Sequence, residues 1–360
     1  MAMTELPPTM RSLVAPTYCK PAGYEIQEVP TPTIQGPNDI LIQVHAAGIM
    51  TADTLMALPI KLGIVASGVV IATGSAVTTL RPGDAVYGMA FGRPIDYGAP
   101  PGFCAEYALG RADLFLSKPA HVAFEDAAAL LGNVLTAVQS IELGHRLLGE
   151  GGREQPAGQD GLRPRRPERD GLRRRPAAED GLRRRARHRH RVHVQGAAPA
   201  APRAVDRVID YQRCAGRLAD AVPPGSVDLA YNTQFAALRG AIPLLRRDAG
   251  VVVSIAGVPP PPLLCQLVGR PLPLLVRWMA GLAQWWYAFL LWGTGVRYAF
   301  VSGGAGRRED LERAGEIIAR GKVRALANVV RLEDIGAVRE ACQMVYTGKG
   351  GVGQLVVKVV

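Results

Sequence analysis

The sequence predicts an α/β protein, made of a small, barrel-like β domain and a second domain with a doubly wound parallel sheet. Three observations predict it. The chain has 360 residues, 48% of them apolar, which is enough for two domains with ordinary cores. Its first 120 residues carry closely spaced apolar runs separated by glycine and proline. Beyond them, apolar runs alternate with helical sequence, as parallel strands and their connecting helices do.

Short apolar runs bounded by turn residues predict the strands of the first domain. DILIQVH at residues 39–45 follows a Gly-Pro-Asn turn, and GVVIATG at 68–74 is bounded by glycines. The turn Pro-Gly-Asp at 82–84 leads into the run AVYG at 85–88. Such closely spaced strands are typical of a small β-barrel.

A change of period near residue 122 predicts the second domain. Residues 122–148 are rich in good helix formers. The segments 206–211, 227–232 and 250–256 are predicted parallel strands, because they are short apolar runs with polar ends. Residues 351–360 are predicted as a terminal strand, and residues 309–343 before it as helical with solvated, mixed-charge faces.

The net charge of +11 is concentrated in one segment. Residues 151–203 hold 15 Arg, no Lys and 6 acids, so their net charge is +9, whereas the other 307 residues have a net charge of +2. A basic binding face over the folded body is therefore disfavoured, and no nucleic-acid partner is predicted. The five scattered cysteines favour neither a disulfide framework nor a four-cysteine zinc site. With no secretory signal recognised, a cytoplasmic protein is expected.

Nine short pieces, in order, resemble the medium-chain dehydrogenase/reductase family in its zinc-free quinone reductase and enoyl reductase branch. The similarity is greatest to fungal members, including enoyl reductases that serve polyketide synthases in secondary metabolism. The pieces are AAGI at 46–49 with Asp53, SGVV at 67–70, PGDAVYG at 82–88, GFCAEY at 102–107, AAAL at 127–130, LTA at 135–137, VIDY at 208–211, SIA at 254–256 and GQLV at 353–356.

The resemblance implies an architecture and an activity. It implies a GroES-like substrate domain at 1–120, completed by 305–360, and a Rossmann cofactor domain at 121–304. It also implies an NADPH-dependent reductase of an activated C=C (enoyl) or quinone, with a small apolar substrate, acting as a monomer or homodimer. The positions where zinc-dependent relatives carry metal ligands hold Met50 and Gly63-Ile64-Val65 here, so no metal site is predicted.

The same resemblance places site residues, although no proton donor stands out and the catalytic residues stay unassigned. Asp53 is expected to orient the nicotinamide or substrate, or else to cap a turn. Thr136 is expected near the nicotinamide ribose, or else as a helix-start hydroxyl, and Met50, Trp278 and Trp285 are expected at the substrate pocket. The expected cofactor-binding residues are Asp53, Thr136, Tyr211, Asn232, Ser254, Ala256 and Gly257; the alternative for Tyr211 is a residue half packed on the sheet.

The glycine-rich turn that holds a pyrophosphate is missing where the family places it, after Gly149. The Arg-rich segment 151–203 stands there instead, with Asp-Gly-Leu-Arg recurring at 160, 170 and 180. Shifting the reading frame permits K-T-V-F-V-P and L-S-G-T-G-S from Gln159, then K-T-V-F-G-A-A, then V-I-A-T-V-S-T-S-K-V from Arg187. The S-T-S-K piece lacks the acid that binds a free ribose 2′-hydroxyl, which favours NADPH.

We infer that residues from about 151 to about 203 are translated out of frame, through a gene-prediction error or a real mutation. The chain is then expected to bind dinucleotides weakly or not at all. Three alternatives remain: a genuine, disordered Arg/Pro-rich insertion; an Arg-rich binder of nucleic acid or an acidic partner; and an impaired pseudogene product.

All four tryptophans lie within residues 278–292, inside a charge-free run that extends to 296. Three interpretations stay open: a pocket wall or subunit face, a monotopic membrane contact, or a true span. If the monotopic interpretation holds, the peripheral membrane contact runs through residues 274–296.

Overall fold

The structure is a computed structural model that describes residues 6–17, 19–55, 62–90, 102–150, 192–193, 207–209, 218–268, 271–304, 306–349 and 353–360. The chain divides into two compact units. Unit 1 comprises Met1–Ile141, Val258–Gln284 and Val301–Val360, and unit 2 comprises Glu142–Gly257 and Trp285–Phe300.

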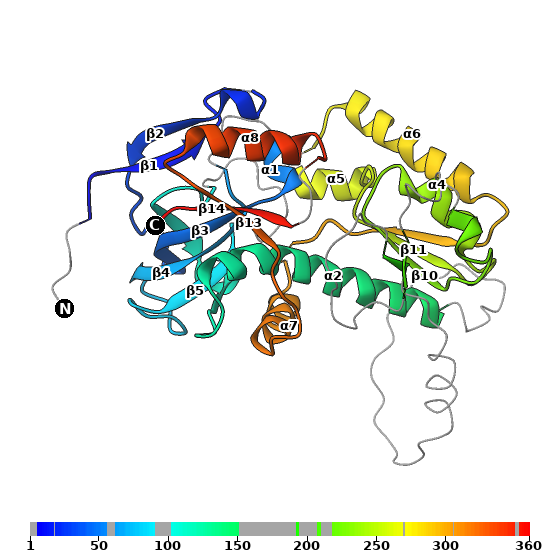
Figure 1. Ribbon diagram of the computed structural model, residues 1–360, viewed down its shortest axis with the longest axis horizontal. Helices are drawn as coiled ribbons and strands as arrows, with labels where there is room; N and C mark the ends of the chain where they lie inside the picture. The colour runs from blue at the N-terminus through cyan, green and yellow to red at the C-terminus, as the bar shows by residue number, and fades with distance from the viewer. Residues whose placement is uncertain are drawn as a thin grey trace, which may run out of the picture. The chain divides into compact units, whose positions relative to one another are not determined.

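Unit 1 contains an antiparallel pair and a larger mixed sheet. The pair is β1 (Thr9–Val14) with β2 (Glu25–Pro30). The larger sheet has the order β13-β14-β3-β4-β5-β7, with β6 also paired to β3 (Figure 1). Its strands are β3 (Asp39–Ile49), β4 (Val65–Thr73), β5 (Ala85–Met89), β6 (Tyr107–Arg111), β7 (Phe115–Ser117), β13 (Ala327–Arg331) and β14 (Gln354–Lys358).

One long core fills unit 1. It holds 37 buried residues that run from Leu13 to Val359, so both ends of the chain contribute to it. The strands predicted at 39–45, 68–74, 85–88 and 351–360 correspond to β3, β4, β5 and β14. Helices α1 (Thr51–Leu55), α5 (Pro261–Val268), α7 (Arg308–Ala319) and α8 (Ile335–Tyr346) complete the unit.

The prediction that residues 309–343 are helical throughout was wrong. Strand β13 interrupts them between α7 and α8 and pairs in parallel with β14. Its sequence ANVVR carries two adjacent valines, which favour a strand.

Helix α2 (Phe124–Glu150) and helix α6 (Leu274–Leu291) both have residues in the two units. The predicted helix at 122–148 is thus a single α2. Among the described residues, α2 is the only helix long and apolar enough to cross a membrane, and more than half of it is buried inside the structure. Burial of this kind is typical of a core helix.

Unit 2 contains a parallel sheet in the order β10-β11-β12 (Figure 1). Its strands are β10 (Leu229–Asn232), β11 (Val251–Ser254) and β12 (Arg297–Phe300), with α4 (Ala237–Ala241) after β10. Every residue of β11 is buried, as expected for a central parallel strand.

A second, very short parallel pair joins β8 (Val192–His193) to β9 (Arg207–Val208). Strand β9 falls within the predicted strand at 206–211. Strand β8 is the part of the Arg-rich tract that the structure describes; the rest of the out-of-frame prediction lies outside the described residues.

Candidate active site

Asp53 is a buried carboxylate near the start of α1 in unit 1. One carboxylate oxygen accepts the N–H of Met50 at 2.7 Å, and the other accepts the N–H of Gly63 at 2.9 Å. Burial raises the pKa of Asp53 to about 7, although the two N–H donors act in the opposite direction. These are the contacts of a cap that ties α1 to the segment before β4. The orientation of a nicotinamide or substrate by Asp53 stays a prediction.

Met50, the expected pocket residue beside Asp53, is partly buried and packs against α2. Its sulfur lies 3.2 Å from the point where a Cβ on Gly132 would stand. Any larger residue in place of Gly132 would therefore displace the Met50 side chain. The placement of Met50 in a substrate pocket stays a prediction.

Thr136 lies in the middle of α2, so the alternative of a helix-start hydroxyl was wrong. Its hydroxyl donates to the carbonyl of Gly132 at 2.7 Å. The backbone of Gly303 packs directly on it, because a Cβ there would come within 2.3 Å of the Thr136 Oγ1. Gly303 also has a φ of +65°, which favours glycine.

Sequence reasoning missed a polar link one turn further along α2. The side-chain amide of Gln139 donates to the carbonyl of Gly304 at 2.9 Å and to a carboxylate oxygen of Asp310 at 3.0 Å. Asp310, in the first turn of α7, is buried. The one available signal was the Gly303-Gly304 pair, which permits close backbone approach.

In unit 2, Asn232 and Ser254 end neighbouring parallel strands and contact each other. The Asn232 amide donates to the Ser254 hydroxyl at 2.9 Å, and that hydroxyl donates to the carbonyl of Ala256 at 2.6 Å. Both side chains are buried, Asn232 at 4% exposure and Ser254 at 0%. The sequence predicted their position at the strand ends. The structure adds that the two side chains are hydrogen-bonded to each other.

Gly257 follows this network and faces two tyrosines that sequence reasoning missed. A Cβ on Gly257 would lie 2.8 Å from the hydroxyl of Tyr298 and 3.3 Å from that of Tyr287. The two rings stack with centroids 5.2 Å apart. Burial raises the pKa of Tyr298. Tyr211, the remaining predicted cofactor residue, lies outside the described residues.

The described ends of β10 and β11 form no phosphate cradle. Asn232 and Ser254 direct their donors at protein acceptors, and the space beside Gly257 is occupied by the Tyr298 hydroxyl. A pyrophosphate needs free N–H donors at the start of a helix. Among the described residues, α4 after β10 is only five residues long, and α5 after β11 begins with two prolines, which have no N–H to donate.

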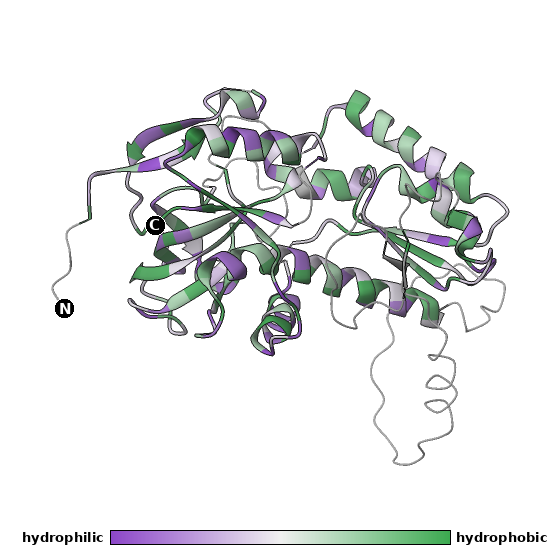
Figure 2. Ribbon diagram, viewed as in Figure 1, coloured by the Kyte–Doolittle hydropathy of each residue, from purple (hydrophilic) through white to green (hydrophobic). Residues whose placement is uncertain are grey.

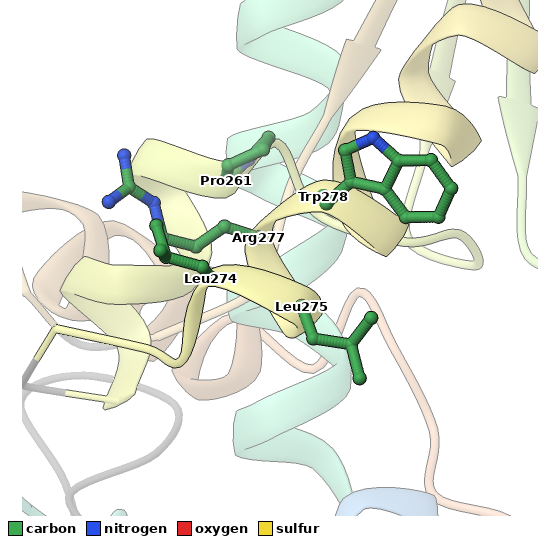
Figure 3. Close-up of a pocket in the computed structure, with 5 residues that line it drawn as sticks. All are labelled: Pro261, Leu274, Leu275, Arg277 and Trp278. Atoms are coloured by element: carbon green, nitrogen blue, oxygen red, sulfur yellow. The ribbon is translucent and has the colours of Figure 1, made fainter.

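Trp278 and Trp285 lie on α6 and are 63% and 64% exposed. Trp278 borders an open hollow of about 690 Å³ with Pro261, Leu274, Leu275 and Arg277. Figure 3 shows the Arg277 guanidinium at one end of this group and the Trp278 indole at the other. The assignment of both tryptophans to a substrate pocket stays a prediction.

No group of three or more His, Cys, Asp or Glu side chains is arranged to hold a metal ion within the described part of the chain. Cys104 and Cys342 are buried near Asp53, and burial raises the pKa of both thiols. Burial thus disfavours the thiolate, the nucleophilic form, at both positions.

Comparison with known proteins shows what parts of the chain are similar to. The alcohol dehydrogenase GroES-like domain matches residues 36–120. The chain is 30% identical over 146 residues to the dehydrogenase mokE of Monascus pilosus, which is 38% of this chain and 39% of that protein. It is 33% identical over 130 residues to the trans-enoyl reductase tndF of Aspergillus flavipes, 33% of this chain and 37% of that one. Residues 36–120 therefore carry a GroES-like domain, as the resemblance to the medium-chain dehydrogenase/reductase family predicts.

The match spans about two fifths of the curated relatives' length. The structural similarity covers more of the chain than the sequence similarity does. A quinone oxidoreductase from Coxiella burnetii superposes over 98% of this chain and 100% of its own, with a TM-score of 0.64 and 18% identity. The predicted fold class, α/β with a GroES-like domain and a Rossmann-like domain, is thereby confirmed.

Proposed function

We propose that the protein is a zinc-independent reductase that transfers hydride from NADPH to a small apolar substrate with an activated C=C bond or a quinone. The observation that carries the proposal is the identity shared with relatives whose names are dehydrogenase and trans-enoyl reductase. The fold shared with a quinone oxidoreductase supports the second substrate class. A nicotinamide coenzyme is the expected source of hydride in such oxidoreductases.

The sequence supports zinc independence through residue chemistry. Where zinc-dependent relatives carry ligands, this chain has Met50 and Gly63-Ile64-Val65, which offer only a thioether and two aliphatic side chains. A thioether is a soft donor that is not among the usual zinc ligands. Reduction would then depend on orientation of the substrate and on stabilisation of the developing enolate or hydroquinone.

We propose further that this chain holds its coenzyme weakly, because residues 151–203 carry Arg-rich sequence where the family carries its phosphate-binding turn. Two observations support it. No glycine-rich turn follows Gly149 in the sequence. The polar groups at the described ends of β10 and β11 already bond to each other rather than projecting free donors.

A pair of chains tests both parts of this proposal. One is the present chain, and the other carries the alternative-frame sequence across residues 151–203. NADPH oxidation would be followed with a soluble quinone and with an α,β-unsaturated thioester, and NADPH binding by fluorescence titration. We expect the reframed chain to bind NADPH and reduce at least one substrate. The present chain should bind at least about tenfold more weakly, a loss of about 1.4 kcal/mol.

Two results would contradict the proposal in different places. Tight NADPH binding by the present chain would overturn the frame interpretation. A well-folded reframed chain that binds NADPH but reduces neither substrate class would overturn the assigned reaction. Sequencing the transcript across codons 145–210 supplies an independent check on the frame.

A further inference from the structure

Helix α6 presents an unusually apolar, tryptophan-rich face to solvent. Trp292, just after the helix, is 83% exposed, and Trp278 and Trp285 are each more than 60% exposed. Figure 2 shows the helix coloured mainly as hydrophobic. The other exposed apolar side chains of the same face are Leu274, Leu275, Met279, Leu282, Trp286 and Phe289.

These side chains lie on one side of the helix. At about 100° per residue, the set from Leu274 to Trp292 falls within roughly 140° of the helix circumference. The opposite side of the helix packs against the protein. Ala280 is buried there, and the side-chain amide of Gln284 donates to the carbonyl of Val258 at 2.7 Å. The exposed face is therefore an organised surface and not a frayed end.

The face is large for a protein in water. At about 250 Å² per indole, the exposed fractions of the four tryptophans alone amount to roughly 600 Å². That is at the upper end of the largest apolar patch on an ordinary monomer, about 300–600 Å², before the leucines, Met279 and Phe289 are added. A surface of this size and composition marks an interaction site.

Along the sequence, the charged residues nearest α6 are all basic. Between Asp248 and Glu309 the sequence contains no acidic residue and five arginines: Arg270, Arg277, Arg297, Arg307 and Arg308. Arg277 lies on α6 itself, and its guanidinium borders the hollow with Leu274 and Pro261 (Figure 3). A cation beside an open apolar hollow suits an anionic group carried on an apolar body.

We propose that α6 docks this protein on the surface of a bilayer that contains anionic lipid. The apolar face would lie among the headgroups and upper acyl chains, with the indoles at the interfacial depth that tryptophan prefers. Arg277 would contact lipid phosphate or carboxylate. This binding is independent of the proposed reductase activity, although it would bring an apolar substrate dissolved in the bilayer close to the protein.

The charge pattern favours a bilayer over a second copy of the chain. A symmetric dimer through α6 would bring two identical, acid-free, arginine-bearing segments together. Neither copy's α6 carries an acid that could pair with Arg277 of the other copy. An anionic bilayer supplies the opposite charge and an apolar phase on one surface.

The chain contains its own probe for this proposal, since all four tryptophans lie at 278–292. The full chain would be mixed with phosphatidylcholine vesicles with and without about one third phosphatidylserine, then floated on a density gradient. We expect the protein to float with the anionic vesicles, its tryptophan emission to shift to shorter wavelength, and brominated acyl chains to quench that emission.

Three variants sharpen the test. The triple variant Trp278→Gln/Trp285→Gln/Trp292→Gln should lose binding by about tenfold or more, since it removes most of the apolar face. Arg277→Gln should weaken binding severalfold on anionic vesicles only. Phe235→Gln is the matched control, because Phe235 is also an exposed aromatic, at 67%, but lies outside α6. Far-UV circular dichroism would establish that each variant is folded.

The outcomes decide the proposal. It is overturned if the wild-type chain fails to float with anionic vesicles, or if the triple variant floats as well as the Phe235→Gln control. A dimer that the triple variant dissociates, with no flotation of either protein, would overturn it in favour of a second copy as the occupant. Selective loss of flotation by the α6 variants would support it.

Discussion

The described residues of units 1 and 2 pack into cores of different size. The main core of unit 1 holds 37 buried residues drawn from both ends of the chain. The described residues of unit 2 form two small clusters instead, one of five buried residues around Val252 and one of three around Ile209. Because apolar burial is the dominant favourable term in folding, the described part of unit 1 has much more of it to offset the conformational entropy that ordering costs.

The pieces of sequence that resemble the medium-chain dehydrogenase/reductase family are also unevenly distributed. They are densest in unit 1, where the barrel strands β3, β4 and β5 pair through long, regular ladders. In unit 2 the strands β10, β11 and β12 pair over only four residues each, and β8 with β9 over two. A parallel sheet of short strands is stable only when helices cover it.

The largest predicted effect separates the two cores directly. Phe115 is 1% exposed and packs edge-on against Phe103, with ring centroids 5.7 Å apart. Phe115→Ala should destabilise unit 1 by about 4 kcal/mol, through lost burial and the cavity left behind. Leu245→Ala in the five-residue cluster of unit 2 should cost about 2 kcal/mol, because a small cluster collapses more easily around a missing group.

Chemical denaturation followed by circular dichroism measures both values. Phe235→Ala serves as the control, since its exposed ring should change the free energy of unfolding by less than about 0.5 kcal/mol. Equal losses for Phe115→Ala and Leu245→Ala would show that the two cores are equally dense, contrary to the comparison drawn above.

The second prediction concerns pH and belongs to unit 1 alone. Burial raises the pKa of Asp53 from 3.8 to about 7, so the folded chain binds more protons than the unfolded chain between these values. The contribution of Asp53 to the free energy of unfolding should therefore be greatest below about pH 4. It should fall by up to about 1.4 kcal/mol per pH unit between about pH 4 and about pH 7. Above that value the contribution becomes constant.

Asp53→Asn isolates the contribution of this group from the other carboxylates. The amide cannot ionise, so the difference in unfolding free energy between the variant and the wild type should change with pH across the window from about 4 to about 7. The amide can accept only one of the two N–H donors of Met50 and Gly63, which adds a constant offset. A difference that does not vary with pH would mean that Asp53 ionises normally.

The sequence predicted the elements whose pattern is local. Strand β11 was found because its four residues form an unbroken apolar run with a polar end, which is how a strand buried on both faces looks. Strand β13 was missed because its residues are only partly buried or exposed, so ANVVR lacks the alternation that marks a half-buried strand. Pairing with β14 stabilises it, and that partner lies more than 20 residues away.

The sequence predicted where several site residues lie in the fold, but not which side chains contact one another. Asn232 and Ser254 were placed correctly at the ends of parallel strands, yet nothing in the sequence shows that their side chains face each other. The link from Gln139 to Asp310 joins residues 171 positions apart, and no spacing rule reaches that far. The α6 face was visible as an apolar run, but only the structure separates its exposed indoles from its buried Ala280.

The smallest predicted effect tests whether the polar network of unit 2 is structural. Ser254 is fully buried, accepts from Asn232 and donates to the carbonyl of Ala256. Ser254→Ala should destabilise the chain by about 1–2 kcal/mol, because it leaves the Asn232 amide without its acceptor in the interior. The loss should be the same from about pH 5 to about pH 8, since neither side chain ionises there.

A double-mutant cycle with Asn232→Ala separates the pair from its surroundings. If the hydrogen bond between the two side chains accounts for the loss, the double variant should cost less than the sum of the single variants by roughly 1 kcal/mol. Strict additivity would mean that each side chain acts independently. The pH-independent loss at Ser254 and the pH-dependent behaviour of Asp53 would then distinguish the two units by chemistry, since a neutral network ties the strands of unit 2 where a buried carboxylate ties α1 in unit 1.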